Sequence, residues 1–360
     1  MLAISIASAG PTVTASAASA TTTGSAASTG SAASTGTPQA WPGPSGSGPD
    51  VLGTTSGKVS GTVVSNGNPV SGATVALLAA SNQAPATLVT ATSSSTGTFQ
   101  LQYSAAQANA QLYVTAVGGT ANGNDVGTAR KLMAAIGNPG APATVTINER
   151  TTVAAVFSLA QFFDGTGGVT GPSPGLPNAM ATAANLAETS SGKVSMVLAD
   201  APNGTATEAL PTFNTLASIV ARCSDGTTAK CNQLFAATKP PRGHQPSDTV
   251  GALLSIVRNP TIRPQPLFAL RDQTAYAPML TAAPASWVLT LVYTAGGFDA
   301  PGQIAFDAAG NAWSGNNFEP PGTAPGPGVS VVGPAGQPIL NSPIIGGGVL
   351  GVGWGTAVDQ

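Results

Sequence analysis

Charged side chains are scarce in this sequence and almost cancel one another. They make up 7% of the 360 residues, and the formal net charge is −2. No basic patch is present to neutralise phosphates, which argues against nucleic acid as a partner. Long apolar runs are missing too. Because no stretch of about 18 apolar residues occurs, we expect no membrane span.

Residue types that serve catalysis or bind metals are few and scattered. The single histidine, His244, lies in the proline-rich stretch KPPRGHQPS, and no G-x-S-x-G motif is present. The Gly-rich runs lack the Lys and Ser/Thr of a phosphate-binding loop. The carboxylates fall in different expected elements: Glu149, Asp164, Glu188 and Asp200. We therefore expect no catalytic, cofactor or metal site, and we expect His244 to be exposed.

Only two cysteines occur, Cys223 and Cys231, in the stretch CSDGTTAKC. An Asp-Gly turn between them would bring their ends together, which favours a disulfide. Two unrelated buried thiols are the alternative, and a metal site is a weaker one because no further ligand lies nearby. A disulfide would agree with an exported protein, placed outside the cell, in the periplasm or on the cell surface.

Residues 1–56 lack basic side chains entirely, since the first is Lys58. The repeat TGSAASTGSAASTG is typical of a disordered, flexible tether that cannot bury enough apolar surface to fold. The opening MLAISIASAG has two interpretations. It is either the tail of a signal peptide that starts upstream of Met1, or a disordered end that merely contains three apolar residues.

Residues 57–118 contain short strand-like runs separated by turn signals, which predicts a small all-β sandwich. In GTFQLQY, for example, Phe99, Leu101 and Tyr103 alternate with polar residues. The stretches GTVVSNGNPVSGATVALL and ATSSSTGTFQLQY resemble the carboxypeptidase regulatory-like, or transthyretin-like, module. That resemblance implies a non-catalytic sandwich found in many secreted and surface proteins.

Residues 125–293 change to helical periodicity and predict a mostly α-helical middle domain. We expect helices capped by Asn148 and by Ser247, another beginning near Phe213, and a weaker one in LPNAMATAANLAE. The second of these should end near Asn259, before a proline. Strands are expected at GKVSMVL and SWVLTLVY. Several of these stretches resemble a helical region that precedes propeller repeats in bacterial surface proteins.

Residues 297–360 predict a partial β-propeller. PGQIAFDAAGNAWSGNN resembles an NHL-type repeat, with a hairpin over residues 299–317 that turns at Ala308–Asn311. The resemblance gives structural turn roles to the following residues: Asp307, Gly310, Asn311, Trp313 and Asp359. AVDQ repeats the opening strand, and its Asp359 lies 52 residues after Asp307, near the roughly 40–50 residues of one blade.

A closed propeller needs about four to eight blades, and the 64 residues from 297 cannot supply them. We therefore expect the chain to be the front part of a longer protein. The hairpin should either lean on the helical domain or be mobile, and residues 355–359 should form a strand of the next blade.

Two classes of function fit this organisation. The first is a non-catalytic exported or cell-surface binding or structural protein, whose partner is an extracellular protein or a carbohydrate. The second is the N-terminal part of an enzyme resembling streptogramin lyases, with its active site in further blades. Trp287 and Trp313 could serve as sugar platforms, but we expect both to pack in cores.

Overall fold

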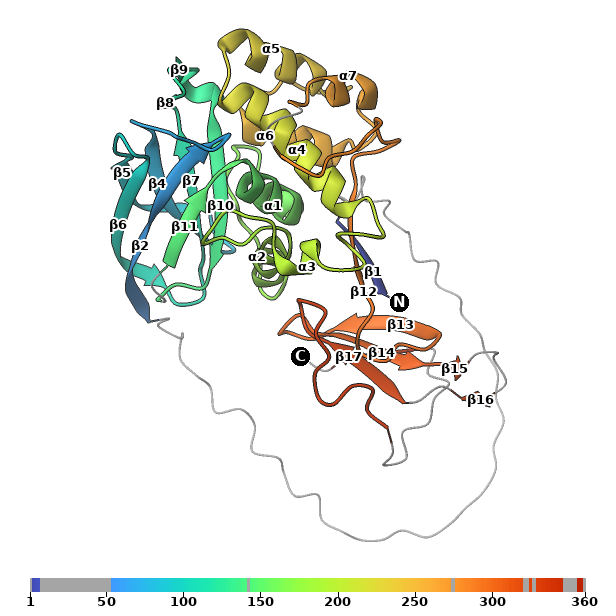
Figure 1. The fold of residues 1–360 in the computed structure, drawn as a ribbon. Coiled ribbons are helices and arrows are strands. Elements are labelled where there is room, and N and C mark those ends of the chain that lie inside the picture. Colours follow the sequence, from blue (N-terminus) through green and yellow to red (C-terminus); the bar gives the residue numbers. More distant parts are fainter. Residues whose placement is uncertain are drawn as a thin grey trace, which may run out of the picture.

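The protein is described by a computed structural model that covers residues 2–6, 53–140, 143–272, 276–319, 324–325, 328–345 and 355–358. These residues form seven α-helices and several β-sheets, so the fold mixes both kinds of element. Figure 1 shows the strands of the N-terminal part on one side of α1 (Glu149–Leu159), helices α4–α7 on the other, and a C-terminal sheet beyond α2 and α3. None of the helices covered by the structure is long and apolar enough to cross a membrane.

Two four-stranded sheets make up the N-terminal part. One has the order β10-β7-β4-β5; in the other, β2 pairs with β11, β3 and β6. The predicted alternation in β6 is present, since Phe99, Leu101 and Tyr103 are buried between exposed glutamines. The bounds are β2 Thr54–Ser65, β3 Asn68–Pro69, β4 Thr74–Ala80, β5 Ala86–Thr92, β6 Thr98–Gln107, β7 Gln111–Val117, β10 Lys131–Gly137 and β11 Ala143–Ile147. Short elements fill the β7–β10 connection: β8 Thr120–Ala121, β9 Asn124–Asp125 and the 3-10 turn η1 Gly127–Ala129.

The sequence predicted that the strand-rich part ends at residue 118, but in the structure it continues beyond that residue. β10 pairs antiparallel with β7, and β11 pairs in parallel with β2, so both sheets are completed by later residues. At Gly61 the two parallel strands lie so close that a Cβ would meet the Val145 carbonyl at 1.7 Å. β10 is buried along most of its length and packs against α1, so its sequence lacks the alternation of a half-buried strand.

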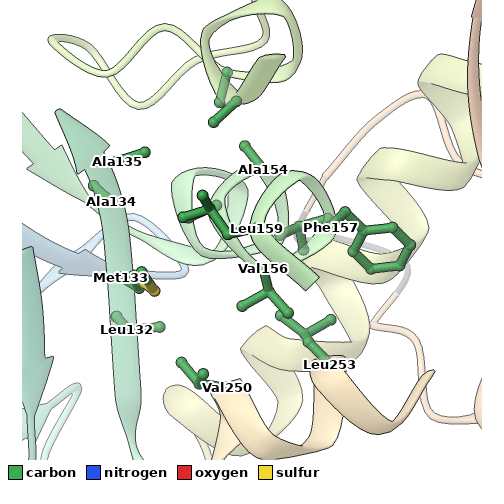
Figure 2. Close-up of a cluster of buried hydrophobic side chains, with 14 of the residues drawn as sticks. Leu132, Met133, Ala134, Ala135, Ala154, Val156, Phe157, Leu159, Val250 and Leu253 are labelled. Carbon is green, nitrogen blue, oxygen red and sulfur yellow. The ribbon is translucent and has the colours of Figure 1, made fainter. Parts of the chain in front are cut away.

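The helices surround α1, which is buried at ten of its eleven positions. Asn148 is its N-cap, as predicted, and its side chain accepts from the Thr151 N–H. Figure 2 shows the α1 side chains between Met133 of β10 and Leu253 of α6. The remaining helices are η2 Ala160–Phe162, α2 Gly175–Leu186, α3 Met196–Ala199, α4 Ala209–Ser224, α5 Thr228–Ala237, α6 Thr249–Arg258 and α7 Pro264–Ala269.

Three local predictions in this region need correction. Helix α6 is capped by Asp248 rather than Ser247, because the Asp248 side chain accepts from the Gly251 N–H at 2.7 Å. The expected strand GKVSMVL contains α3 instead, since Ser195 caps a single helical turn there. Helix α4 begins at Ala209, ahead of Phe213. The strand expected in SWVLTLVY is present as β12, Leu289–Tyr293.

One hydrophobic core joins the strands and the helices. The same buried cluster contains Leu77 and Leu101 of the sheets, Phe157 of α1 and Phe213 of α4. The expected boundary between residues 118 and 125 therefore does not separate two cores. These residues instead share one interior, because α1 packs against β10 on one side and against α2, α4 and α6 on others.

The N-terminal prediction is wrong at its two ends. Residues 2–6 form β1 (Leu2–Ile6), which pairs antiparallel with β12. A physical reason is that β12 has no other strand partner within the structure's described ranges, and its free edge accepts an incoming strand. Strand β2 also begins at Thr54, inside the expected tether. Residues 7–52, which carry the repetitive sequence, lie outside the described residues.

The C-terminal part contains a three-stranded antiparallel sheet with the order β13-β14-β17. Its hairpin turns where predicted, between β13 and β14. A small core of Ala312, Val332 and Phe298 belongs to this sheet alone. The bounds are β13 Pro301–Phe306, β14 Ala312–Asn316, β15 Phe318–Glu319, β16 Ala324–Pro325 and β17 Val329–Val332.

The second expected repeat strand is not observed. Residues 355–358 have no strand assignment, and Asp359 lies outside the described residues. The segment contacts β14 through one hydrogen bond, from the Gly315 N–H to Thr356 Oγ1 at 3.3 Å. Because β14 already pairs with β13 and β17 on its two edges, it has no edge left for another strand.

Candidate functional site

Asp307 holds the hairpin turn through four hydrogen bonds. Its Oδ1 accepts from the N–H groups of Ala309 (3.0 Å) and Asn311 (2.9 Å). Its Oδ2 accepts from Asn311 Nδ2 (2.7 Å) and Trp313 Nε1 (3.0 Å). Burial pushes the Asp307 pKa up, but the hydrogen bonds from Trp313 and Asn311 outweigh it and hold the pKa below its usual value. This geometry gives Asp307 a structural role rather than a ligand-binding one.

The cysteine pair is a disulfide in the structure, with a sulfur–sulfur distance of 2.03 Å. It joins the end of α4 to α5 next to the contact with the N-terminal strands. There Asp225 accepts from Asn66 Nδ2 at 3.1 Å. The disulfide therefore stabilises the part of α4 that meets the sheets.

The scattered carboxylates do not assemble into a site. No group of three or more potential metal-ligating side chains lies together in the residues that the structure covers, and His244 is exposed. Asp164 accepts hydrogen bonds from its own loop, chiefly from the Thr166 side chain, and these bonds lower its pKa. Glu188 is exposed in the turn after α2.

Glu149 lies at the centre of a buried polar network among the described residues. It lies at the start of α1 and accepts from Ser65 Oγ (2.7 Å), Tyr276 Oη (2.6 Å), Ser224 Oγ and the Asn66 N–H (3.3 Å). Burial next to this carboxylate raises the pKa of Tyr276, which keeps its hydroxyl a donor. The Glu149 side chain is fully buried, so a ligand has no access to it.

Arg130 supplies positive charge near that carboxylate. Its guanidinium donates to the backbone carbonyls of Ser224, Gly118, Gly119 and Asn124. Burial lowers the Arg130 pKa, and the nearby Glu149 charge opposes that effect. The network joins the strands, α1 and the end of α4, and we assign it to stability rather than to binding.

An open pocket of about 380 Å³ lies between the helices and the C-terminal sheet. One wall comes from α1, η2 and α2, the floor from β12, and the other wall from the sheet β13-β14-β17. Its volume is within the range of small-molecule sites. The pocket is lined by Phe157, Ser158, Ala160, Gln161, Gly175, Asn178, Ala179, Thr182, Asn185, Leu291, Tyr293, Phe306, Gly310, Ala312, Val332, Gly333 and Pro334.

Asn185 of α2 connects the two walls of the pocket through hydrogen bonds. Its side-chain nitrogen donates to the Pro334 carbonyl at 2.6 Å and to Tyr293 Oη at 3.2 Å. The hairpin turn also rests on α2, since a Cβ on Gly310 would lie 2.6 Å from Asn178 Oδ1. Gly310 has a φ of +80°, which favours glycine as well. The C-terminal sheet therefore contacts the helices, which is one of the two alternatives that the sequence left open.

The lining is uncharged and mainly apolar. Among the residues that line the pocket in the structure, none is Asp, Glu, Lys, Arg, His or Cys. Burial raises the pKa of Tyr293 to about 12 despite the hydrogen bond from Asn185, so its hydroxyl is neutral at physiological pH. Phe306 is 49% exposed at the sheet wall.

Ser158 stands out among the polar lining residues. It is 8% exposed, and its buried hydroxyl has no hydrogen-bond partner among the described residues. A buried hydroxyl without a partner is energetically unfavourable by about 1–3 kcal/mol. The oxygen is out of reach of solvent, so it does not face the open space of the pocket.

Comparison with protein-family models, with curated proteins and with solved structures found no match to this chain. The resemblances to the carboxypeptidase regulatory-like module and to NHL-type repeats therefore stay predictions.

Of the residues that line this pocket, the sequence analysis assigned a role only to Gly310, and that role was in the hairpin turn. Trp287, which was considered, is buried in the main core, and Trp313 serves the Asp307 turn. The sequence gives a weak indication that the half-exposed Phe306 belongs to a site, because Phe306 is the aromatic residue of a strand next to a glycine turn. The sequence around Ser158 does not identify it as a pocket residue, because the opposite wall is formed by residues more than 140 positions later.

Proposed function

We propose that this chain is a non-catalytic, exported or cell-surface binding protein that holds a small uncharged ligand in the pocket between the helices and the C-terminal sheet. The uncharged lining carries the proposal. A charged ligand would lose its hydration there and gain no opposite charge, which is strongly unfavourable. An uncharged ligand loses far less and buries apolar surface in return.

The placement outside the cell is supported by the Cys223–Cys231 disulfide and by the sparsely charged composition. The two four-stranded sheets are compatible with a carboxypeptidase regulatory-like sandwich that is extended by β10 and β11. The sheet β13-β14-β17, with its Asp307 turn, is compatible with part of an NHL-type blade. In this proposal both are scaffolds, and they place the pocket where the blade meets the helices.

A binding role is favoured over catalysis by the chemistry of the lining. General acid–base catalysis needs a group whose pKa lies near the working pH. Tyr293 is the titratable residue of the lining, and its pKa of about 12 makes it a poor base at neutral pH. The remaining side chains offer hydrogen bonds and apolar contacts, which suit recognition.

The proposal is tested by calorimetric titration with three ring compounds of similar size: benzyl alcohol, benzoate and benzylammonium. We expect benzyl alcohol to bind and the two ions to bind at least tenfold more weakly. In Ala179→Phe, a bulky ring in the lining of α2 should fill the pocket and abolish binding. Ala181→Phe is the matched control, because Ala181 lies on the same helix, is exposed and does not line the pocket.

Equal binding by the Ala179 and Ala181 variants would place the ligand elsewhere and contradict the proposal. Equal affinity for the alcohol and the two ions would contradict the argument from the uncharged lining. Thermal unfolding of both variants shows whether each is folded before the titrations are compared.

A further inference from the structure

Positive charge is concentrated in the stretch from α5 to α7 of this sparsely charged chain. Residues 228–269 carry five of the twelve Lys and Arg residues and one acidic residue, Asp248, so their net charge is +4, while that of the whole chain is −2. Residues 270–360 carry five acidic residues and one basic residue. The chain is therefore asymmetric in charge, and such asymmetry indicates an anionic partner.

Four of these cations lie on α5 and at its contact with α7, although the sequence contains no basic run. The Arg263 side chain, from the residue before α7, donates to the carbonyl of Ala236 in the last turn of α5. Lys230 lies in the first turn of α5, and Lys239 and Arg242 follow its C-terminal end. All four side chains belong to exposed residues, and we call them the basic surface. Figure 1 shows α5 and α7 next to each other, at the end of the molecule far from the sheet β13-β14-β17.

The basic surface keeps its charge within the described part of the chain. No carboxylate there pairs with Lys230, Lys239 or Arg242. Asp248, the acidic residue of this stretch, is used as the cap of α6. Lys230 lies at the N-terminal end of α5, where a positive charge interacts unfavourably with the helix dipole. Helix stability therefore does not explain its position, whereas an anionic partner does.

Exposed amide side chains lie among these cations. Asn232 and Gln233 are on α5, Gln245 is in the loop after it, and Gln265 is on α7. An amide both donates to and accepts from a hydroxyl group. The surface can therefore bind carboxylates through its cations and hydroxyl groups through its amides, and an acidic polysaccharide carries both groups along one chain.

Two other kinds of polyanion fit this surface less well. A lipid surface is usually bound through apolar side chains that enter the interface. The large apolar side chains that are exposed in the described residues all lie outside α5–α7: Met196, Ile304, Phe306, Leu340 and Ile345.

Duplex DNA carries one charge per about 1.7 Å of its axis, so it is matched by closely spaced cations. Lys230 and the Ala236 carbonyl that binds Arg263 are six residues apart on α5, which is about 9 Å along the helix. Cations at this spacing fit a polymer whose charges are separated by neutral groups.

We infer that the basic surface binds an acidic polysaccharide, with its cations paired to carboxylates and the amides of α5 and α7 bonded to hydroxyl groups. None of its residues lines the pocket between the helices and the C-terminal sheet. This second site therefore adds to the proposed function and does not depend on it.

The test compares polygalacturonate, which has a carboxylate on each sugar, with the neutral polymer dextran. Binding to the whole chain is measured by calorimetry at low and at high salt. We expect polygalacturonate to bind at about 20 mM salt and roughly tenfold more weakly at about 200 mM, because salt screens exposed charges. Dextran should not bind.

Lys230→Glu/Lys239→Glu should weaken polygalacturonate binding roughly tenfold or more, because two favourable charge pairs become repulsive. Lys58→Glu/Lys193→Glu is the matched control. Both of its lysines are exposed and lie outside the basic surface, and the net charge changes by the same amount. We expect the control to lose less than about twofold. Thermal unfolding shows whether each variant is folded.

Four outcomes would overturn the inference: no binding of polygalacturonate by the wild-type chain, equal binding of dextran, an equal loss in the two double variants, or tighter binding of a DNA duplex or of phosphatidylglycerol vesicles than of polygalacturonate. The comparisons among wild-type ligands stand even where a variant fails to fold. Titration with benzyl alcohol tests the proposed function separately, so the two failures are distinguishable.

Discussion

The buried carboxylate of Glu149 allows the sharpest prediction about stability. In Glu149→Ala the hydroxyls of Ser65, Ser224 and Tyr276 and the Asn66 N–H lose their common acceptor. The nearby positive charge of Arg130 loses its opposing charge as well. Glu149 also lies in the first turn of α1, where a negative charge interacts favourably with the helix dipole.

The expected loss is about 3–5 kcal/mol, the range for removing one partner of a buried charged network. Because the shared core spans more than 200 residues, that corresponds to a fall in melting temperature of roughly 6–20 °C. Glu149→Gln should lose about half as much. Its amide oxygen still accepts from Tyr276 and Asn66, and the two serine hydroxyls can rotate to accept from its NH₂ group.

Urea unfolding followed by both circular dichroism and tryptophan fluorescence measures the loss, with coincident transitions as the check on two-state behaviour. Glu188→Ala is the control, because Glu188 is an exposed carboxylate and its removal should change stability by no more than about 0.5 kcal/mol. A loss below about 1 kcal/mol for Glu149→Ala would refute the reasoning.

Three other predictions concern the disulfide, the hairpin turn and the buried Tyr293. Titration of the denatured, unreduced protein should find no free thiol, and replacing Cys223 and Cys231 by serine should cost roughly 2–3 kcal/mol, as expected for a short closed loop; two free thiols would contradict the disulfide. In Asp307→Asn, one acceptor oxygen remains where two oxygens now accept from four donors. The backbone N–H of Asn311 should therefore exchange its hydrogen roughly tenfold faster. Unchanged exchange would show that the turn does not depend on the carboxylate. The pKa of Tyr293 is raised from 10.0 to about 12, so the unfolded tyrosine ionises first, and the stability that this group contributes below pH 10 should be lost as the pH rises toward 12. Tyrosinate absorbance and unfolding curves over that pH range check this prediction. A free energy of unfolding that rises with pH over this range would contradict it.

Local signals in the sequence predicted local structure well. The Asn148 cap and the Ala308–Asn311 turn depend on residues only a few positions apart, and both are present. The prediction that Ser247 caps α6 was wrong by one residue, because the adjacent Asp248 can cap a helix as well. The carboxylate of Asp248 makes the stronger hydrogen bond and caps α6.

Features that depend on contacts between distant segments were missed. β10 appears in the sequence as an apolar, alanine-rich run, and only its burial against both β7 and α1 makes it a strand. The strand β1 pairs with a partner almost 290 residues away. The pocket itself is formed only where the C-terminal sheet packs against α1 and α2. Tertiary contacts of this kind leave no pattern in the surrounding sequence.

A crystal structure of the protein soaked with 4-bromophenol tests the central claim most directly, because anomalous scattering locates the bromine without ambiguity. The account predicts a bromine peak in the pocket between α2 and the sheet β13-β14-β17. A peak confined to another part of the surface, or an empty pocket at a concentration that saturates binding in solution, would contradict it.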